Sequence, residues 1–171
     1  MINYNKSADL TCKYYKQFIK EVPNFPKEGV SFKDISPLLS SPDFPQVIKD
    51  MGKLVQKPDY WVGIDARGFL FAGALSYEFG GGVIMCRKKG KLPPPTESYS
   101  YELEYGKDTL EIQPGRGNVV IVDDVYATGG TMGAVEKLCE NAGYKVIDKI
   151  CLIDLLYLHD EIKCKSLVKY E

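Results

Sequence analysis

Apolar residues recur along the chain in two different patterns, and these patterns predict the elements of the fold. Residues 8–22 place apolar side chains such as Leu10 and Tyr14 at intervals of four, which predicts an amphipathic helix. Prolines follow this stretch, so residues 23–45 are expected to form an ordered but irregular segment. Residues 46–56 are predicted to form a second helix.

Short apolar runs then appear at residues 60–64, 82–86, 118–122 and 146–156. Continuous apolar runs are typical of parallel strands that are buried on both faces, whereas half-exposed strands alternate. Helical stretches at residues 69–79 and 132–142 follow the first and the third run. The pattern therefore predicts an α/β fold with a mostly parallel central sheet flanked by helices.

A polar stretch, residues 92–113, separates the second run from the third. It begins with three prolines, Pro93–Pro95, and continues with alternating tyrosines over residues 98–105. This alternation predicts a two-stranded excursion or a flexible flap that lies outside the core. Long loops in compact domains are usually functional or disordered, so we expect a functional flap over residues 92–113.

Length and charge narrow the kind of protein. The 171 residues are expected to form a single domain, and the net charge of −1 argues against a nucleic-acid binder. Five cysteines without a CxxC pair argue against a zinc site and for reduced thiols, and the single histidine, His159, is expected in a loop or at the surface. No apolar run approaches the roughly 20 residues of a membrane span, and the N-terminus lacks the apolar core of a signal peptide. We therefore expect a soluble, cytoplasmic protein with no membrane or nucleic-acid partner.

The most informative segment follows the third apolar run, which is expected to end in two adjacent carboxylates, Asp123 and Asp124. A short loop then opens a helix, and its residues are Ala127, Thr128, Gly129, Gly130 and Thr131. Glycines let backbone N–H groups approach a ligand closely, and a helix N-terminus presents unpaired donors to an anion. The segment therefore predicts a phosphate-binding loop at the carboxyl end of a strand, where open parallel sheets bind their ligands.

The two carboxylates need a partner other than the phosphate, because they would repel it. Ribose hydroxyls are suitable partners, since carboxylates are strong hydrogen-bond acceptors. A hydrated divalent cation nearby is a second option, and an acidic strand end without function is a third. The apolar strand, the acidic pair and the glycine loop together favour a ribose phosphate as the ligand.

The string from Val119 to Thr131 resembles the phosphoribosyl-pyrophosphate motif of the type I phosphoribosyltransferase family. Further segments resemble the adenine-specific branch of that family in the same order, namely residues 25–38, 63–69, 87–93, 103–106 and 166–171. The resemblance implies the type I phosphoribosyltransferase fold for residues 1–171. It places an N-terminal helix and base-binding segment in residues 1–45 and a flexible catalytic flap at residues 92–113.

The resemblance also implies a role for individual residues. The loop Ala127–Thr131 would bind the 5′-phosphate, and Asp123 and Asp124 would bind the ribose hydroxyls. Pyrophosphate would be bound by Asp65, Ala66, Arg67, Arg87, Lys88 and Lys91, and the turn at Asp65 often contains a non-proline cis peptide in this family. Adenine would be bound by Val30, Ser31, Phe32 and Lys33.

The flap would carry two further catalytic residues, Glu104 and Tyr105. Glu104 would handle a proton of the purine ring as general base or acid. Tyr105 would help to close the flap and exclude water. Arg67, Asp123 and Asp124 complete the catalytic set that the resemblance implies.

The implied reaction joins adenine to phosphoribosyl pyrophosphate and yields AMP and pyrophosphate. Mg²⁺ would be the cofactor, held mainly by the substrate phosphates and not by protein metal ligands. The family is usually homodimeric, so a homodimer is expected.

Two other functions stay open at this point. The acceptor could be another base such as xanthine, because small changes in residues 30–33 decide which purine edge is bound. A regulator that senses phosphoribosyl pyrophosphate without catalysis would need neither Glu104 nor Tyr105. The chain also departs from the family pattern at Lys33, where arginine is usual, at Pro94, and in a shorter connection over residues 113–117.

Overall fold

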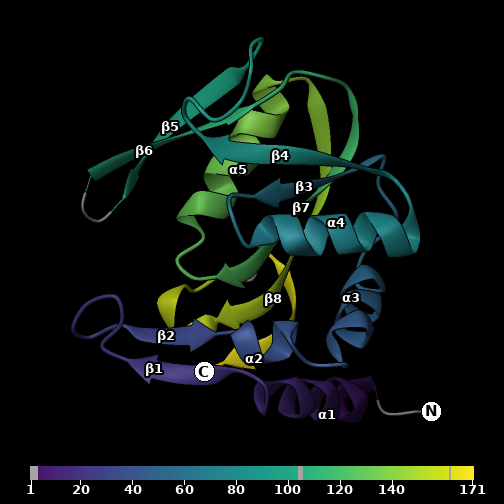
Figure 1. Ribbon diagram of the computed structural model, residues 1–171, viewed down its shortest axis with the longest axis vertical. Helices are drawn as coiled ribbons and strands as arrows, with labels where there is room; N and C mark the ends of the chain where they lie inside the picture. The colour runs from purple at the N-terminus through teal and green to yellow at the C-terminus, as the bar shows by residue number, and fades with distance from the viewer. Residues whose placement is uncertain (1–3, 104–105, 162) are drawn as a thin grey trace. The chain divides into compact units, whose positions relative to one another are not determined.

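The computed structural model describes residues 4–103, 106–161 and 163–171 (Figure 1). Their contacts divide the chain into two compact units, Met1–Val47 and Ile48–Glu171. Each unit is described by itself below. Among the described residues, no helix is both long enough and apolar enough to cross a membrane.

The first unit opens with helix α1 (Tyr4–Lys16), followed by the antiparallel strands β1 (Lys20–Pro23) and β2 (Ser31–Asp34). The prediction of one helix over residues 8–22 is therefore wrong beyond Lys16. Val22 precedes a proline, which disfavours the helical conformation and favours an extended one. Val22 instead pairs with Phe32 across the hairpin.

Residues 23–45 are more regular than predicted. Besides β2, they contain the short helix α2 (Ser36–Leu39), which has proline in its first turn, where the missing N–H has no helical partner to lose. Helix α3 (Phe44–Gly52) begins slightly before the predicted second helix. Several prolines of this segment therefore lie at the ends of helices and strands, and the proline content did not exclude regular structure.

The second unit is built on a seven-stranded sheet in the order β5-β6-β4-β3-β7-β8-β9. Its strands are β3 (Tyr60–Ile64), β4 (Gly82–Lys88), β5 (Glu97–Leu103), β6 (Gly106–Ile112), β7 (Gly117–Tyr126), β8 (Tyr144–Leu155) and β9 (Lys165–Tyr170). Strands β4, β3, β7, β8 and β9 run parallel, and β5 and β6 form an antiparallel hairpin. The four predicted apolar runs are all strands, which confirms the mostly parallel α/β sheet; β9 was not predicted.

Two helices cover this sheet, α4 (Gly68–Phe79) and α5 (Gly130–Asn141). The β3–α4–β4 connection moves along the sheet in one direction and the β7–α5–β8 connection in the other. Since such crossovers are right-handed, the two helices lie on opposite faces. Side chains alternate accordingly, with Val62 packed in a cluster that includes Val135 of α5, and Gly63 facing Ala72 of α4.

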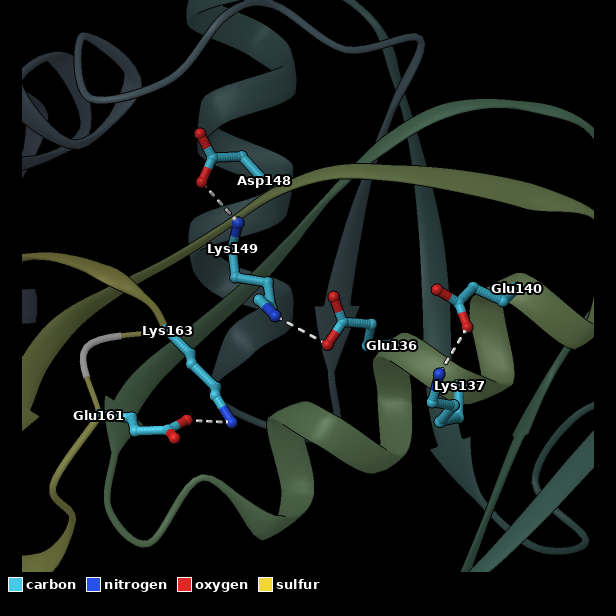
Figure 2. A network of polar contacts seen from close by, with 7 residues as sticks. All are labelled: Glu136, Lys137, Glu140, Asp148, Lys149, Glu161 and Lys163. Carbon is cyan, nitrogen blue, oxygen red and sulfur yellow. Dashed lines mark hydrogen bonds and ion pairs between the residues drawn. The ribbon is translucent and has the colours of Figure 1, made fainter.

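An ion pair also holds α5 to the sheet (Figure 2). Lys149 of β8 places Nζ 2.7 Å from Oε2 of Glu136 on α5. Lys149 is also tied to its own strand, since its backbone N–H donates to Asp148 Oδ1 at 2.9 Å. The ion pair helps to fix the helix whose N-terminus carries the predicted phosphate loop.

The β5–β6 hairpin confirms the predicted two-stranded excursion. The prediction that it lies outside the core is wrong for β6, because Leu110 and Ile112 are buried in the main apolar cluster. β6 also pairs with β4, with Glu111 opposite Arg87. The alternating tyrosines of β5 follow the same principle, because Tyr99 and Tyr101 pack with one face of the strand against this cluster.

Candidate active site

A cleft of about 340 Å³ lies where the direction of the strand connections reverses, between β3 and β7. The carboxyl ends of both strands line it, as expected for a ligand site at the switch point of an open α/β sheet. Lys88, Tyr101, Asp108 and Thr131 contribute to its walls from neighbouring elements. The cleft therefore brings together segments that are far apart in the sequence.

The turn after β3 forms one wall of this cleft with Asp65, Ala66 and Arg67. The Asp65–Ala66 peptide bond is cis, as the family resemblance implied. Helix α4 begins at the next residue, Gly68, and a Cβ there would lie only 2.7 Å from the carbonyl oxygen of Val122 on β7. Glycine therefore permits the start of α4 to pack directly against β7, which places Arg67 beside the acidic pair.

The acidic pair lies within β7 and not at its end, so the prediction that the strand stops at these carboxylates is wrong. β7 continues to Tyr126, paired with β8. Both carboxylates line the cleft although side chains alternate along a strand. Each carboxylate also has a partner of its own.

Asp124 is buried and forms an ion pair with Arg67, with Nε 2.9 Å from Oδ2. Burial raises the pKa of the Asp124 carboxyl, and the guanidinium of Arg67 opposes this rise. A buried carboxylate is costly without a cation or hydrogen-bond donor, so Arg67 stabilises its charged form. One face of the strand thus joins the β3 turn to β7 through a charged contact.

Asp123 lines both the cleft and an adjoining cavity formed by the predicted phosphate loop. Burial, followed by the negative charge of Asp124, raises the pKa of the Asp123 carboxyl well above its usual value. The backbone N–H of Asp124 donates to Asp123 Oδ1 at 2.9 Å and partly offsets this effect. Asp123 is therefore the carboxylate at the junction of the two spaces.

The predicted phosphate loop surrounds the adjoining cavity, of about 80 Å³, with residues Ala127 through Thr131. Gly129 is the N-cap of α5 and has a φ of +83°, a left-handed conformation that favours glycine. The loop and the first turn of α5 supply backbone donors and the positive end of a twelve-residue helix. The residues named from the sequence thus enclose one cavity, and their role in binding a phosphate stays a prediction.

The four predicted pyrophosphate cations do not all lie in the cleft. Arg67 and Lys88 line it, and Lys88 Nζ lies 3.6 Å from Asp108 Oδ2. Arg87 and Lys91 do not belong to the lining. Arg87 instead donates from Nε to Asp65 Oδ2 at 3.2 Å and from Nη1 to the Lys91 carbonyl at 3.5 Å.

Tyr101 lines the cleft but was not predicted from the sequence. Its hydroxyl lies 3.3 Å from Oγ1 of Thr131, which links the β5–β6 hairpin to the phosphate loop. The alternation that places Tyr99 and Tyr101 on one face of β5 was the available signal. Glu104 and Tyr105, predicted as catalytic, lie outside the described residues.

The predicted adenine-binding segment belongs to the first unit, at and just before β2. Lys33 is buried and its Nζ lies 2.7 Å from Glu21 Oε2, while Ser31 also donates to that oxygen at 3.2 Å. The ring of Phe32 packs edge-on against Phe25, with centroids 5.1 Å apart. Lys33, which replaces the usual arginine, is thus engaged within its own hairpin.

No cluster of three or more His, Cys, Asp or Glu side chains suited to a metal ion occurs among the described residues. The carboxylates that line the cleft come closest to a metal-binding cluster. However, Asp65, Asp108 and Asp124 are each paired with a cationic side chain. These residues suit a charged ligand that brings its own counterions.

A cavity enclosed by a glycine loop at a helix N-terminus, beside a carboxylate pair at the switch point of a parallel sheet, is the arrangement expected for a ribose-phosphate ligand. The profile of the phosphoribosyl transferase domain matches residues 46–168. The adenine phosphoribosyltransferase of Hydrogenovibrio crunogenus is 44% identical over 165 residues, covering 91% of this chain and 95% of the relative. That of Bdellovibrio bacteriovorus is 45% identical over 162 residues, covering 91% and 98%.

Solved structures agree with these relatives. The adenine phosphoribosyltransferase of Thermoanaerobacter pseudethanolicus superposes with a TM-score of 0.86 at 43% identity, covering 93% of this chain and 99% of the other. The Saccharomyces cerevisiae enzyme, solved with an imino-altritol bisphosphate and adenine, gives a TM-score of 0.84 at 34% identity, covering 94% and 99%. The chain belongs to the adenine phosphoribosyltransferase family, within the type I phosphoribosyltransferases.

Proposed function

We infer that this chain transfers the 5-phosphoribosyl group of phosphoribosyl pyrophosphate to adenine, forming AMP and pyrophosphate in purine salvage. The observation that carries this inference is Asp123, which lines both the phosphate loop's cavity and the larger cleft. A ribose at this junction would have its 5′-phosphate on one side and its pyrophosphate on the other. The adenine bound to the Saccharomyces cerevisiae relative supports adenine as the acceptor.

We propose that the donor lies along these two spaces in order. The 5′-phosphate would bind backbone N–H groups of the loop Ala127–Thr131, and the ribose hydroxyls would bind Asp123 and Asp124. Pyrophosphate would occupy the cleft beside the Asp65–Arg67 turn and Lys88. Arg87 would act mainly by orienting Asp65, since its guanidinium is engaged there.

In the reaction, the bond between C1 of the ribose and the pyrophosphate oxygen breaks, and its electron pair leaves with pyrophosphate. A new bond forms between C1 and a ring nitrogen of adenine, and the purine loses a proton. The carboxylates of Asp123 and Asp124 would stabilise positive charge on the sugar ring, and Arg67 and Lys88 would stabilise the leaving group. Glu104 and Tyr105 keep the roles implied by the family, as general acid or base and as a lid.

Mg²⁺ is proposed as the cofactor, brought to the cleft by the substrate phosphates, where it neutralises their charge. The carboxylates that line the cleft are mostly paired with cations, which supports a metal held by the substrate. Residues 1–171 are proposed to act as one phosphoribosyltransferase domain. A cytoplasmic location is proposed because all five cysteines are free thiols.

A homodimer is proposed through the exposed apolar face around α4 and β4. Leu70 and Tyr77, seven residues apart on α4, are strongly exposed for large apolar side chains. Val83 and Met85 are also exposed, and their register with Trp61 and Gly63 places them on the α4 face of the sheet. Several large apolar side chains exposed on one face are typical of an interface. Analytical ultracentrifugation should give twice the chain mass, and Met85→Lys should shift the mass towards one chain.

A turnover panel of adenine, hypoxanthine, guanine, xanthine and uracil, with phosphoribosyl pyrophosphate and Mg²⁺, tests the function. AMP from adenine is expected to dominate. Preference for a 6-oxo purine would make the acceptor assignment wrong. Binding of the donor without any nucleotide product would favour the non-catalytic sensor.

Replacing Glu104 tests the catalytic flap. Glu104→Ala should lower kcat by about 10²-fold or more, as expected for a general acid or base, with little change in donor affinity. Glu102→Ala is the matched control, because Glu102 is an exposed acidic residue of the same hairpin. Equal kcat values for the two variants would remove Glu104 from the mechanism.

A further inference from the structure

The carboxyl end of β7 contacts a buried histidine–carboxylate pair that the reaction does not use. Asp154 of β8 is fully buried, and its Oδ1 lies 2.7 Å from Nε2 of His159. His159 lies in a loop, as one of the two expectations had it, but its side chain is only 7% exposed and so is not at the surface. Because a carboxylate only accepts hydrogen bonds, Nε2 of the imidazole is the donor.

This pair holds the ring of Tyr126. Tyr126 is the last residue of β7, and its ladder partner on β8 is Asp154 itself. The imidazole of His159 packs against the Tyr126 ring with centroids 4.7 Å apart and planes at 81°. The tyrosine ring is thus fixed at its base by strand pairing and at its side by an imidazole that a buried carboxylate orients.

The far end of the same ring supports the phosphate loop. An added Cβ on Gly129 would lie 2.4 Å from the Tyr126 hydroxyl oxygen and 2.9 Å from its Cζ. The backbone of the loop therefore rests directly on the end of the tyrosine. Tyr126 also lines the cavity that the loop encloses.

We propose that Tyr126 is a positioning residue for the 5′-phosphate site, and that His159 and Asp154 act through it. The proposal rests on the proposed function only for the identity of the phosphate, since the loop and its support exist without catalysis. The loop binds an anion through backbone N–H groups, whose directions are set by the φ and ψ angles at Gly129. A rigid support beneath that glycine keeps these donors aligned before the ligand arrives, so less ordering is required on binding.

His159 is the appropriate residue for this support because it has two separate tasks. Its Nε2–H satisfies Asp154, whose other oxygen has no hydrogen-bond partner among the described residues. Its ring makes an edge-to-face contact with the ring of Tyr126. A glutamine at the same position would keep a donor for Asp154 but would not supply an aromatic ring, which separates the two tasks.

Binding of ribose 5-phosphate and of pyrophosphate, measured separately by calorimetry, tests the proposal without requiring turnover. Tyr126→Ala should weaken ribose 5-phosphate binding by about tenfold and leave pyrophosphate binding within about twofold. Tyr126→Phe keeps the ring, removes only the hydroxyl that contacts the loop, and should weaken ribose 5-phosphate binding by about two- to threefold. A folded Tyr126→Ala variant that binds ribose 5-phosphate like the unmodified protein would overturn the proposal.

A double-mutant cycle tests whether His159 acts through the tyrosine. His159→Gln alone should weaken ribose 5-phosphate binding by about threefold, and should have no further effect in the Tyr126→Ala background. An equal threefold effect in both backgrounds would show that His159 does not act through Tyr126. In steady-state kinetics, the same variants should raise KM for phosphoribosyl pyrophosphate, with KM for adenine and kcat nearly unchanged.

Tyr144→Phe is the control for a general loss of stability. Tyr144 is a largely buried tyrosine at the opposite end of β8, and its hydroxyl donates to the Gln113 carbonyl at 3.0 Å. This variant should lower the melting temperature without changing ribose 5-phosphate binding. If it weakened binding as much as Tyr126→Phe, the effect would be one of stability and the positioning role would be wrong. Absence of AMP formation would contradict the proposed function but leave these binding results interpretable.

Discussion

The two halves of β7 bury different kinds of side chain although they belong to one strand. Val119, Val120, Ile121 and Val122 are fully buried apolar residues that pack between the covering helices. The following half carries Asp123 and Asp124, whose pKa values are raised by burial, and then a loop with a left-handed glycine. The first half contributes to stability through apolar burial, whereas the second half buries carboxylates, which is unfavourable unless each has a cation or hydrogen-bond donor.

The two halves also differ in what their side chains require from neighbouring residues. An apolar side chain in the first half requires only space, and the neighbouring strands supply it. Each carboxylate in the second half requires a specific neighbour: Arg67 for Asp124 and a backbone N–H for Asp123. The loop that follows β7 in turn packs through Gly129 on the end of Tyr126. Substitutions in the two halves should therefore have different kinds of effect.

Adding a methyl group to the loop should have the largest effect on binding. Gly129→Ala forces an L-residue into φ +83° and places its Cβ 2.4 Å from the Tyr126 hydroxyl. We expect donor affinity to fall by about 10²-fold, because a small displacement of binding groups is amplified in affinity and rate. Gly133→Ala is the control, since nothing lies within 4 Å of its Cβ on α5, and it should preserve binding while slightly raising stability. Normal affinity of Gly129→Ala in calorimetry would contradict the close packing of the loop.

Removing the paired carboxylate should have the next largest effect. Asp124→Ala leaves Arg67 without this partner and removes an acceptor for the ribose, so donor affinity should fall by about 10- to 100-fold. Ile121→Val in the apolar half should cost about 0.5–1.5 kcal/mol of unfolding free energy and leave donor affinity unchanged. Equal donor affinity in Asp124→Ala and the unmodified protein would refute the ribose-hydroxyl role.

Asp123→Asn should raise the stability of the folded protein at neutral and higher pH, because it removes a buried carboxyl group from the second half of β7. The raised pKa means that the folded protein holds this proton more tightly than the unfolded chain does. Stability from this group is therefore lost as pH rises through the folded pKa, and the deficit is full above it. Thermal melts should show Asp123→Asn more stable than the unmodified protein at pH 8, with the gain disappearing below about pH 4, where both states are protonated. Turnover should fall in the same variant, and a gain that grows towards low pH would contradict the direction of the pKa shift.

The smallest effect is expected at the contact between the hairpin and the loop. Tyr101→Phe removes the hydroxyl that lies 3.3 Å from Thr131 Oγ1. KM for phosphoribosyl pyrophosphate should rise by about two- to fivefold, corresponding to one neutral hydrogen bond. Tyr99→Phe, on the same face of β5, is the control and should leave KM unchanged. A rise of similar size in both variants would assign the effect to the hairpin as a whole.

Much of the second unit could be predicted because its signals are local. Apolar runs at residues 60–64 and 118–122 are strands, and the glycine loop after the acidic pair opens a helix. Where the prediction failed, a longer-range interaction decided the outcome. Val22 became part of a hairpin through pairing with Phe32, and Leu110 entered the core through pairing of β6 with β4.

The sequence alone determined which groups this protein has for chemistry: a glycine loop at a strand end, adjacent carboxylates, and a set of cations. Tertiary structure decided which of them line the cleft. Arg87 forms an ion pair with Asp65, whereas Arg67 forms one with Asp124. Tyr101 and His159 contact residues of other elements. The physical reason is that backbone conformation and burial follow local patterns, whereas the partner of a charged side chain depends on which strands lie next to each other in the sheet.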